Sequence, residues 1–159
     1  MANINKETTT KMRRLLSSWM VFKQKTHTFH WDLVGNGFHE LHRFFKDLYT
    51  HADKNVDEIA ERIRQVGEKL GMSLSQASEN SAVKDENAPG DTESFMRRTL
   101  EALSALTVLQ NEIFVEADQQ EDYVTMDLLT ELTKWTEFQS WFISSWLENA
   151  KETEDEDRD

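Results

Sequence analysis

The chain has 159 residues and a formal net charge of −12, because 30 acidic residues outnumber 18 basic ones. Its length suits one compact domain, its hydrophobic content of 38% argues against a generally disordered chain, and the absence of cysteine excludes disulfides, thiolate catalysis and cysteine-based metal sites. The acidity argues against a generally basic nucleic-acid-binding surface, and it is compatible either with cationic partners or with solubility alone.

The helix-breaking residues divide the chain into four long stretches. One proline and five glycines are confined to three places, which predicts helices before residue 34 and over residues 38–66, 92–119 and 122–148. In the first two stretches, apolar residues recur at steps of three, four and seven, so each helix has one apolar stripe. The stripe residues are Leu15, Trp19, Phe22, Phe29 and Leu33 in the first stretch and Phe38, Leu41, Phe45, Leu48, Ala52, Ile59, Ile63 and Val66 in the second.

The third and fourth stretches repeat this rhythm. Asp91 follows Pro89 and Gly90 and is the expected N-cap of the third helix. The apolar positions are Leu103, Leu106, Ile113 and Ala117 in the third stretch and Leu128, Leu132, Trp135, Phe142 and Trp146 in the fourth. Because no segment alternates with period two over a useful length, we predict an all-α, four-helix bundle.

The connection over residues 67–91 is too long for a tight hairpin. It predicts a long crossover between the second and third helices, with a short extra helix over residues 73–80. We predict a single domain over residues 1–148, followed by an acidic, mobile tail over residues 149–159.

All five histidines lie between residues 27 and 51. His30 and His42 each lie about five residues from the turn around Gly35 and Gly37, so we expect them to stand at similar heights on neighbouring helices. Asp57 and Glu61 are four residues apart on one face of the second helix, and imidazole with carboxylate suits iron or zinc. Each of these residues, taken alone, is more often a cap or a solvent-facing side chain, but their combined spacing favours a metal centre.

Helical geometry separates the two halves of this candidate centre. His42 and Asp57 are roughly 22 Å apart at 1.5 Å per residue, so one straight helix cannot bring them to the same metal. An antiparallel twofold dimer with its axis near Tyr49 and Thr50 would set His42 of one chain opposite Asp57 of the other. The chain also lacks the Glu-x-x-His motif that holds metals inside a single bundle. We therefore expect the site to lie between subunits.

Two segments resemble the Dps-like mini-ferritins, the DNA-protection-during-starvation proteins. Residues 25–42 contain a His-Trp pair and a Phe-x-x-Leu-His run, and residues 57–67 begin with an Asp-x-x-x-Glu-Arg run. The resemblance is strongest over residues 25–67, with weaker support over 122–146. It implies a ferritin-like bundle, a hollow dodecamer built from antiparallel twofold dimers, and an iron-oxidising centre at each twofold interface. Members of this family oxidise Fe(II), often with hydrogen peroxide, and store the ferric product inside the shell.

The resemblance also implies roles for matched positions. His30 and His42 match the ligands from one subunit, Asp57 and Glu61 match those from its neighbour, and Trp31 matches an aromatic residue beside the centre. Iron is the implied metal, and zinc is an alternative occupant. Acidic residues that line the family's iron-entry pores correspond to Asp122, Asp127 and Glu131. For Asp122, an ordinary acid at a helix N-terminus is an equal alternative.

One position departs from the family pattern. An acidic residue usually stands four residues after the second histidine, and here that residue is Lys46. A lysine ammonium donates hydrogen bonds and has no lone pair for a metal. We therefore expect one metal position to be retained and the second to be weakened or lost. Such a lysine could also pair with Asp57 or Glu61 of the facing chain.

Three functions remain open from the sequence. The leading hypothesis is a ferroxidase that stores iron in a cage and protects against oxidative damage. The alternatives are a shell of the same fold that is structural or DNA-protecting because Lys46 disables its centre, and a cage that binds zinc or another metal. DNA-binding members use a lysine-rich tail, whereas residues 1–14 hold only four bases and one acid, so we do not expect DNA condensation at physiological salt. We expect a cytoplasmic protein, because the sequence lacks a membrane span and a secretory signal.

Overall fold

The computed structural model describes residues 4–86 and 89–156, with side chains described as far as residue 148. These residues form helices and connecting loops, and no strand occurs among them. The helices are α1 (Lys6–Asp32), α2 (Phe38–Gln65), α3 (Leu74–Asn80), α4 (Thr92–Gln119) and α5 (Tyr123–Glu156). The predicted all-α bundle, its long crossover and its short extra helix are therefore confirmed.

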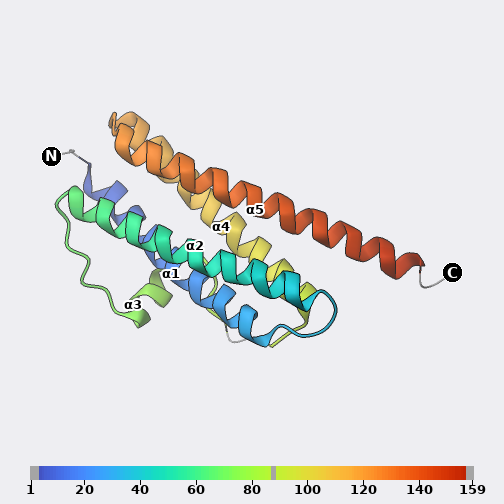
Figure 1. Ribbon diagram of the computed structural model, residues 1–159. Helices are drawn as coiled ribbons and strands as arrows, with labels where there is room; N and C mark the ends of the chain where they lie inside the picture. Colours follow the sequence, from blue (N-terminus) through green and yellow to red (C-terminus); the bar gives the residue numbers. More distant parts are fainter. Residues whose placement is uncertain (1–3, 87–88, 157–159) are drawn as a thin grey trace.

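The four long helices form two antiparallel hairpins that pack together, α1 with α2 and α4 with α5 (Figure 1). The crossover returns the chain along the bundle, so α4 runs antiparallel to α1. Two contacts fix this direction: Lys11 near the start of α1 pairs with Glu116 near the end of α4, and Phe29 near the end of α1 stacks on Phe95 near the start of α4. The short helix α3 lies in the crossover and packs against α1.

Side-chain caps explain where several helices begin. Asn5 accepts the backbone N–H of Thr8 at the start of α1, and Asp91 accepts that of Ser94 at the start of α4, as the sequence predicts. The short helix α3 in the crossover begins with a capping box between Ser73 and Gln76. These bonds satisfy backbone N–H groups that have no partner within the helix.

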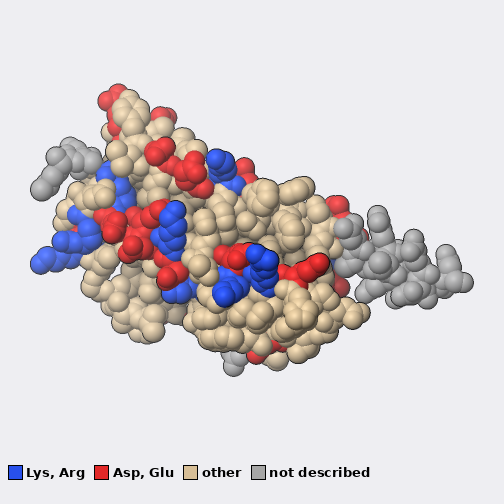
Figure 2. Space-filling view, viewed as in Figure 1, with Lys and Arg blue, Asp and Glu red and all other residues tan. Residues whose placement is uncertain are grey.

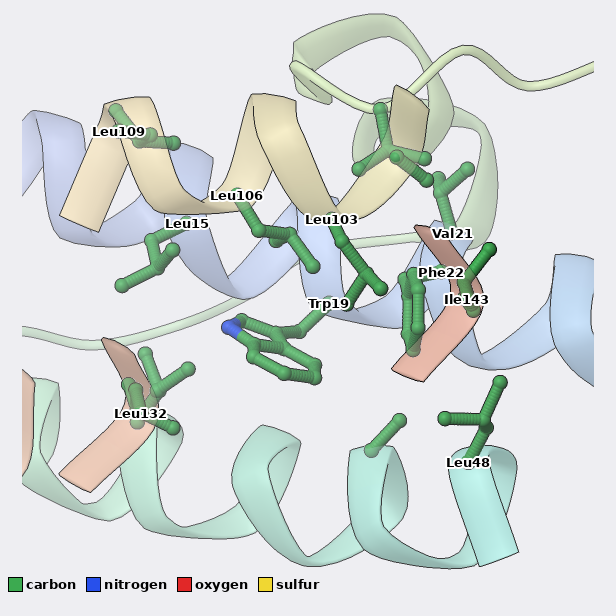
Figure 3. Packing of buried hydrophobic residues seen from close by; sticks show 14 of the residues in the cluster. Leu15, Trp19, Val21, Phe22, Leu48, Leu103, Leu106, Leu109, Leu132 and Ile143 are labelled. Carbon is green, nitrogen blue, oxygen red and sulfur yellow. The ribbon is translucent and has the colours of Figure 1, made fainter. Parts of the chain in front are cut away.

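The core is centred on Trp19, which is fully buried among side chains of all four long helices (Figure 3). Its ring packs edge-on against Phe22, with centroids 5.4 Å apart, and at 5.7 Å from Trp135. Leu103 and Leu106 of α4 close over it. Because each fully buried large apolar side chain contributes about 1.5–3 kcal/mol, this cluster is the main stabilising element of the bundle.

The buried face of α5 differs from the predicted stripe. Leu132 is buried as expected, but Phe142 is 39% exposed. Leu129, Ile143 and Leu147 are buried instead. The helix is apolar on two adjacent faces, so periodicity alone does not decide which face turns inward.

Helix α5 extends into the segment predicted to be an acidic, mobile tail. The helix continues as far as Glu156, so the backbone of residues 149–156 is helical, while residues 157–159 lie outside the described residues. The mobility of this tail stays a prediction. None of the described helices combines the length and apolar character that crossing a membrane requires.

Candidate metal centre

His30 and His42 form a reciprocal pair where α1 ends and α2 begins. Their rings are stacked, with centroids 3.7 Å apart and planes 23° apart. Nδ1 of His30 lies 2.8 Å from the backbone carbonyl oxygen of His42, and Nδ1 of His42 lies 3.0 Å from that of His30. A carbonyl oxygen only accepts, so each Nδ1 donates, and in the neutral ring Nε2 then carries the lone pair. The expected equal height of the two residues is confirmed.

The tight turn between the helices creates this pair. Gly35 and Gly37 have φ of 95° and 73°, in the left-handed region that glycine adopts without steric strain. The turn sets the last turn of α1 beside the first turns of α2. The carbonyl groups at the end of a helix lack partners within it, so the bond from His42 also satisfies a free carbonyl of α1.

Aromatic rings pack against the His30 side of the histidine pair. The ring of His27 lies between those of Trp31 and Tyr49, with centroid distances of 4.0 and 3.9 Å. Tyr49 also meets His30 edge-on at 5.3 Å. Burial, reinforced by the neighbouring His30 and a nearby lysine, lowers the pKa of His27 below its ordinary value. This lowered pKa favours the neutral form of His27, whose ring packs beside the pair.

Phe38 covers the outer side of His42. It belongs to the predicted apolar stripe of α2, yet it is 37% exposed, because it lies at the first position of the helix, next to the turn. Its ring stacks on His42 with centroids 4.8 Å apart.

The carboxylates expected to complete the centre lie elsewhere in the chain. Asp57 and Glu61 are exposed on α2, and neither forms a hydrogen bond or an ion pair with another described residue. Within the described part of one chain, no three His, Asp or Glu side chains are placed to hold a metal together. The structure thus brings His30 and His42 together but not these two acids. This agrees with the helical rise, and a site completed between subunits stays a prediction.

The three predicted pore residues have different environments. Asp122 is buried: its Oδ1 accepts Arg62 Nη2 at 2.7 Å and the backbone N–H of Thr125 at 3.2 Å. Burial alone would raise the pKa of Asp122, but hydrogen bonds from Thr125 and Arg62 bring it below its ordinary value. Asp127 and Glu131 are exposed. The contacts of Asp122 are those of an acid at a helix N-terminus, and a pore role for the three residues stays a prediction.

Sequence reasoning missed the role of Arg62, which is 7% exposed and also donates from Nε to Thr125 at 2.9 Å. The available signal was its place in the buried face of α2, between Ile59 and Ile63. A buried arginine needs an acidic partner, and Asp122 supplies it.

Known proteins share this architecture. The model of the ferritin-like domain family matches residues 9–153. The DNA protection during starvation protein of Brevibacillus brevis is 30% identical over 141 residues, covering 86% of this chain and 92% of that protein. The Dps structure from Vibrio cholerae O1, described as a member of a broad superfamily of ferritin-like diiron-carboxylate proteins, has a TM-score of 0.85 at 27% identity, covering 92% of this chain and 98% of its own. Dps from Staphylococcus aureus has a TM-score of 0.87 at 26% identity, covering 91% and 97% of the two chains. With its bundle, its crossover and its histidine pair, the chain belongs to the Dps-like mini-ferritins of the ferritin-like family.

Proposed function

We propose that this protein forms a cytoplasmic, dodecameric cage of antiparallel twofold dimers that oxidises Fe(II) and stores the ferric product. The observation that carries the proposal is the His30–His42 pair, whose two Nδ1–carbonyl bonds leave both Nε2 atoms available as metal ligands. Histidine ligands in metalloproteins commonly donate their other ring nitrogen in this way, which fixes the ring and its tautomer. Family membership and the diiron-carboxylate class of the similar Dps protein from Vibrio cholerae O1 support the same function.

In this proposal the substrate Fe(II) binds between two subunits. The Nε2 atoms of His30 and His42 bind it from one side, and Asp57 and Glu61 of the partner subunit bind it from the other. The two carboxylates favour the more highly charged ferric product. Each Fe(II) gives up one electron, so one hydrogen peroxide, with two protons, oxidises two Fe(II) and yields two waters. Removing two Fe(II) and one peroxide together would protect against oxidative damage. Oxygen is the alternative oxidant.

Two further groups have supporting roles in the proposal. The ring of His27 contacts both His30 and Trp31, so Trp31 is separated from His30 by one ring. In the proposal, Trp31 would form a wall of the centre. The exposed acids Asp127 and Glu131 would attract cations toward an entry pore near the start of α5, where Asp122 also lies, paired with Arg62.

The first test compares histidines of the same hairpin. The double variant His30→Ala/His42→Ala should lower the initial rate of Fe(II) oxidation at least about tenfold, because a lost ligand costs no less than a lost outer-shell partner. His39→Ala is the matched control, since His39 is exposed and, among the described residues, its ring has an aromatic contact only with Phe38, at 5.7 Å. The measurement is the growth of ferric absorbance after Fe(II) and peroxide are added.

A second variant separates chemistry from folding. Asp57→Asn changes an exposed side chain that forms no hydrogen bond or ion pair with a described residue of its own chain, so it should leave the subunit folded and still slow oxidation. Wild-type rates in both Asp57→Asn and the double histidine variant would refute the proposed centre.

Lys46 favours a second candidate function, a Dps-like shell whose centre is impaired. Such a shell would be structural or DNA-protecting, or it would hold zinc at His30 and His42. Tight zinc binding without oxidation of Fe(II) would support this candidate over a ferroxidase.

A further inference from the structure

Several charged side chains of α2 form no ion pair or hydrogen bond with another described residue, and three of them bear on the proposed centre. Lys46, Asp57 and Glu61 are exposed, and none forms an ion pair or hydrogen bond with another described residue. By contrast, Asp53 of the same helix pairs with Lys23. Lys46 and Asp57 are roughly 16 Å apart along the helix, so they cannot pair within one subunit.

The proposed twofold dimer brings these charges together. An axis near Tyr49 and Thr50 sets His42 opposite Asp57 of the partner subunit. Lys46 lies one helical turn from His42, about 6 Å along the helix, a distance that the four-carbon lysine side chain can span. The Lys46 ammonium can therefore reach the space between His42 and the partner's Asp57.

With this lysine, the charges of the centre suit a single divalent ion. Two carboxylates and one ammonium leave one net negative charge when both imidazoles are neutral. One divalent ion changes this to one net positive charge, and a second ion would bring three positive charges with no further acid to offset them. An ammonium carries the same net charge as a carboxylate with a divalent ion bound to it. Lys46 can thus replace both an acidic ligand and a metal.

We propose that the Lys46 ammonium stands in the second metal position and pairs with Asp57 of the partner subunit, so that each centre binds one divalent ion. The same ion pair holds the two subunits together before metal arrives. This inference rests on the proposed inter-subunit centre, and it adds how many ions that centre holds and what stabilises it when it holds none.

The test is a zinc titration of the assembled protein by calorimetry, because zinc is redox-inert and reports binding without turnover. The wild type should bind one zinc ion per subunit at the centre, and Lys46→Asp should bind two. Lys46→Leu removes the charge without adding a ligand and should still bind one. Lys54→Asp makes the same charge change elsewhere on α2 and should also bind one. Zinc bound at other places is counted with His30→Ala/His42→Ala and subtracted.

The outcomes separate this inference from the function on which it rests. Two zinc ions per wild-type centre, or one in an assembled Lys46→Asp protein, would overturn the inference while leaving the ferroxidase proposal in place. Equal zinc binding by the wild type and the double histidine variant would overturn the centre itself.

Thermal unfolding in a chelator supplies an independent readout. Without metal, Lys46→Asp loses the ion pair and gains a third carboxylate at the interface, so its Tm should lie below that of the wild type. Added salt should raise the Tm of this variant by screening the repulsion, and zinc should raise it more than it raises that of the wild type. Equal Tm values of the two proteins at low salt without metal would contradict the proposed ion pair.

Discussion

The guanidinium of Arg62 links the end of α2 to the start of α5. It bonds to Thr125 and to the carboxylate of Asp122, and the side chains of Arg62 and Asp122 are only 8% and 6% exposed. Removing one partner of a buried pair leaves the other as an uncompensated buried charge. This contact is therefore a point at which a single substitution should weaken the whole bundle.

We predict that Arg62→Met lowers the free energy of unfolding by about 3–5 kcal/mol, because Asp122 loses its cation while remaining buried. Chemical denaturation of the variant and the wild type measures this difference. Arg64→Met is the control: Arg64 is exposed and bonds only to the backbone carbonyl of Glu68, so its loss should cost less than about 1 kcal/mol. If the two substitutions lowered the free energy of unfolding equally, the buried Arg62–Asp122 pair would contribute no more to stability than the exposed Arg64 does.

The candidate site could be predicted from sequence only in part. The spacing of His30 and His42 around a glycine turn was sufficient to predict their meeting. The bonds from each Nδ1 to the other residue's carbonyl depend on the exact path of the turn, which residue spacing does not specify. The burial of Asp122 was also beyond prediction, because it depends on an arginine 60 residues away in the chain.

At the scale of secondary structure, one acidic side chain adds an ion pair to the other contacts that hold the crossover to α1. Glu86 pairs with Lys25 at 3.0 Å and with Lys84 at 2.7 Å. Hydrogen bonds from Lys84 and Lys25 lower the pKa of Glu86 from 4.5 to about 2. Since its pKa is depressed in the folded state, the stabilisation is fully present above pH 4.5 and is lost as the pH falls through about 2.

We predict that Glu86→Gln loosens the crossover without unfolding the bundle, because the amide keeps the shape of the side chain but carries no charge for the two lysines. Limited proteolysis at neutral pH should cut the variant faster within residues 66–91. Acidification toward pH 2 should raise cleavage by an acid-active protease in the wild type more than in the variant. Glu79→Gln, at an exposed position of α3, should behave as the wild type. Wild-type resistance in Glu86→Gln at neutral pH would contradict this role.

The helices themselves were predictable because proline and glycine are so few and stand at the real boundaries. The start of α4 after Asp91 and the short helix α3 follow from local capping chemistry, which the sequence displays directly. Which face of α5 is buried in the bundle was not predictable in the same way. Leu128 and Leu129 are equally suited to a buried position, and so are Phe142 and Ile143. Tertiary packing determines which of two neighbours of similar hydrophobicity is buried.

At the scale of the whole molecule, the distribution of charge bears on the partners that the protein can bind. Acidic and basic side chains are interspersed over the face shown in Figure 2, and no large basic patch occupies it. The chain as a whole carries −12. Repulsion between such a surface and the phosphates of DNA should outweigh the few bases near the N-terminus.

We predict that the assembled protein does not shift supercoiled DNA in a gel at moderate salt and shifts it weakly, if at all, at low salt. The loss with salt follows from the small number of phosphate contacts that four basic residues near the N-terminus allow. A variant with lysines added to residues 1–14 serves as the positive control. Tight binding of the wild type at moderate salt would show that a basic surface forms in the assembly.

The reciprocal hydrogen bonds of His30 and His42 have a further consequence for the proposed centre, because they would affect how fast and how tightly it binds a metal. Neither ring can turn without breaking its hydrogen bond to a carbonyl group of the other helix, so the folding of the hairpin fixes the orientation of both rings. The rotational entropy that two free imidazoles would lose on meeting a metal has already been lost in folding. In the proposed centre, an arriving ion would therefore find the two histidine ligands already oriented, and it would still need the carboxylates of the neighbouring subunit.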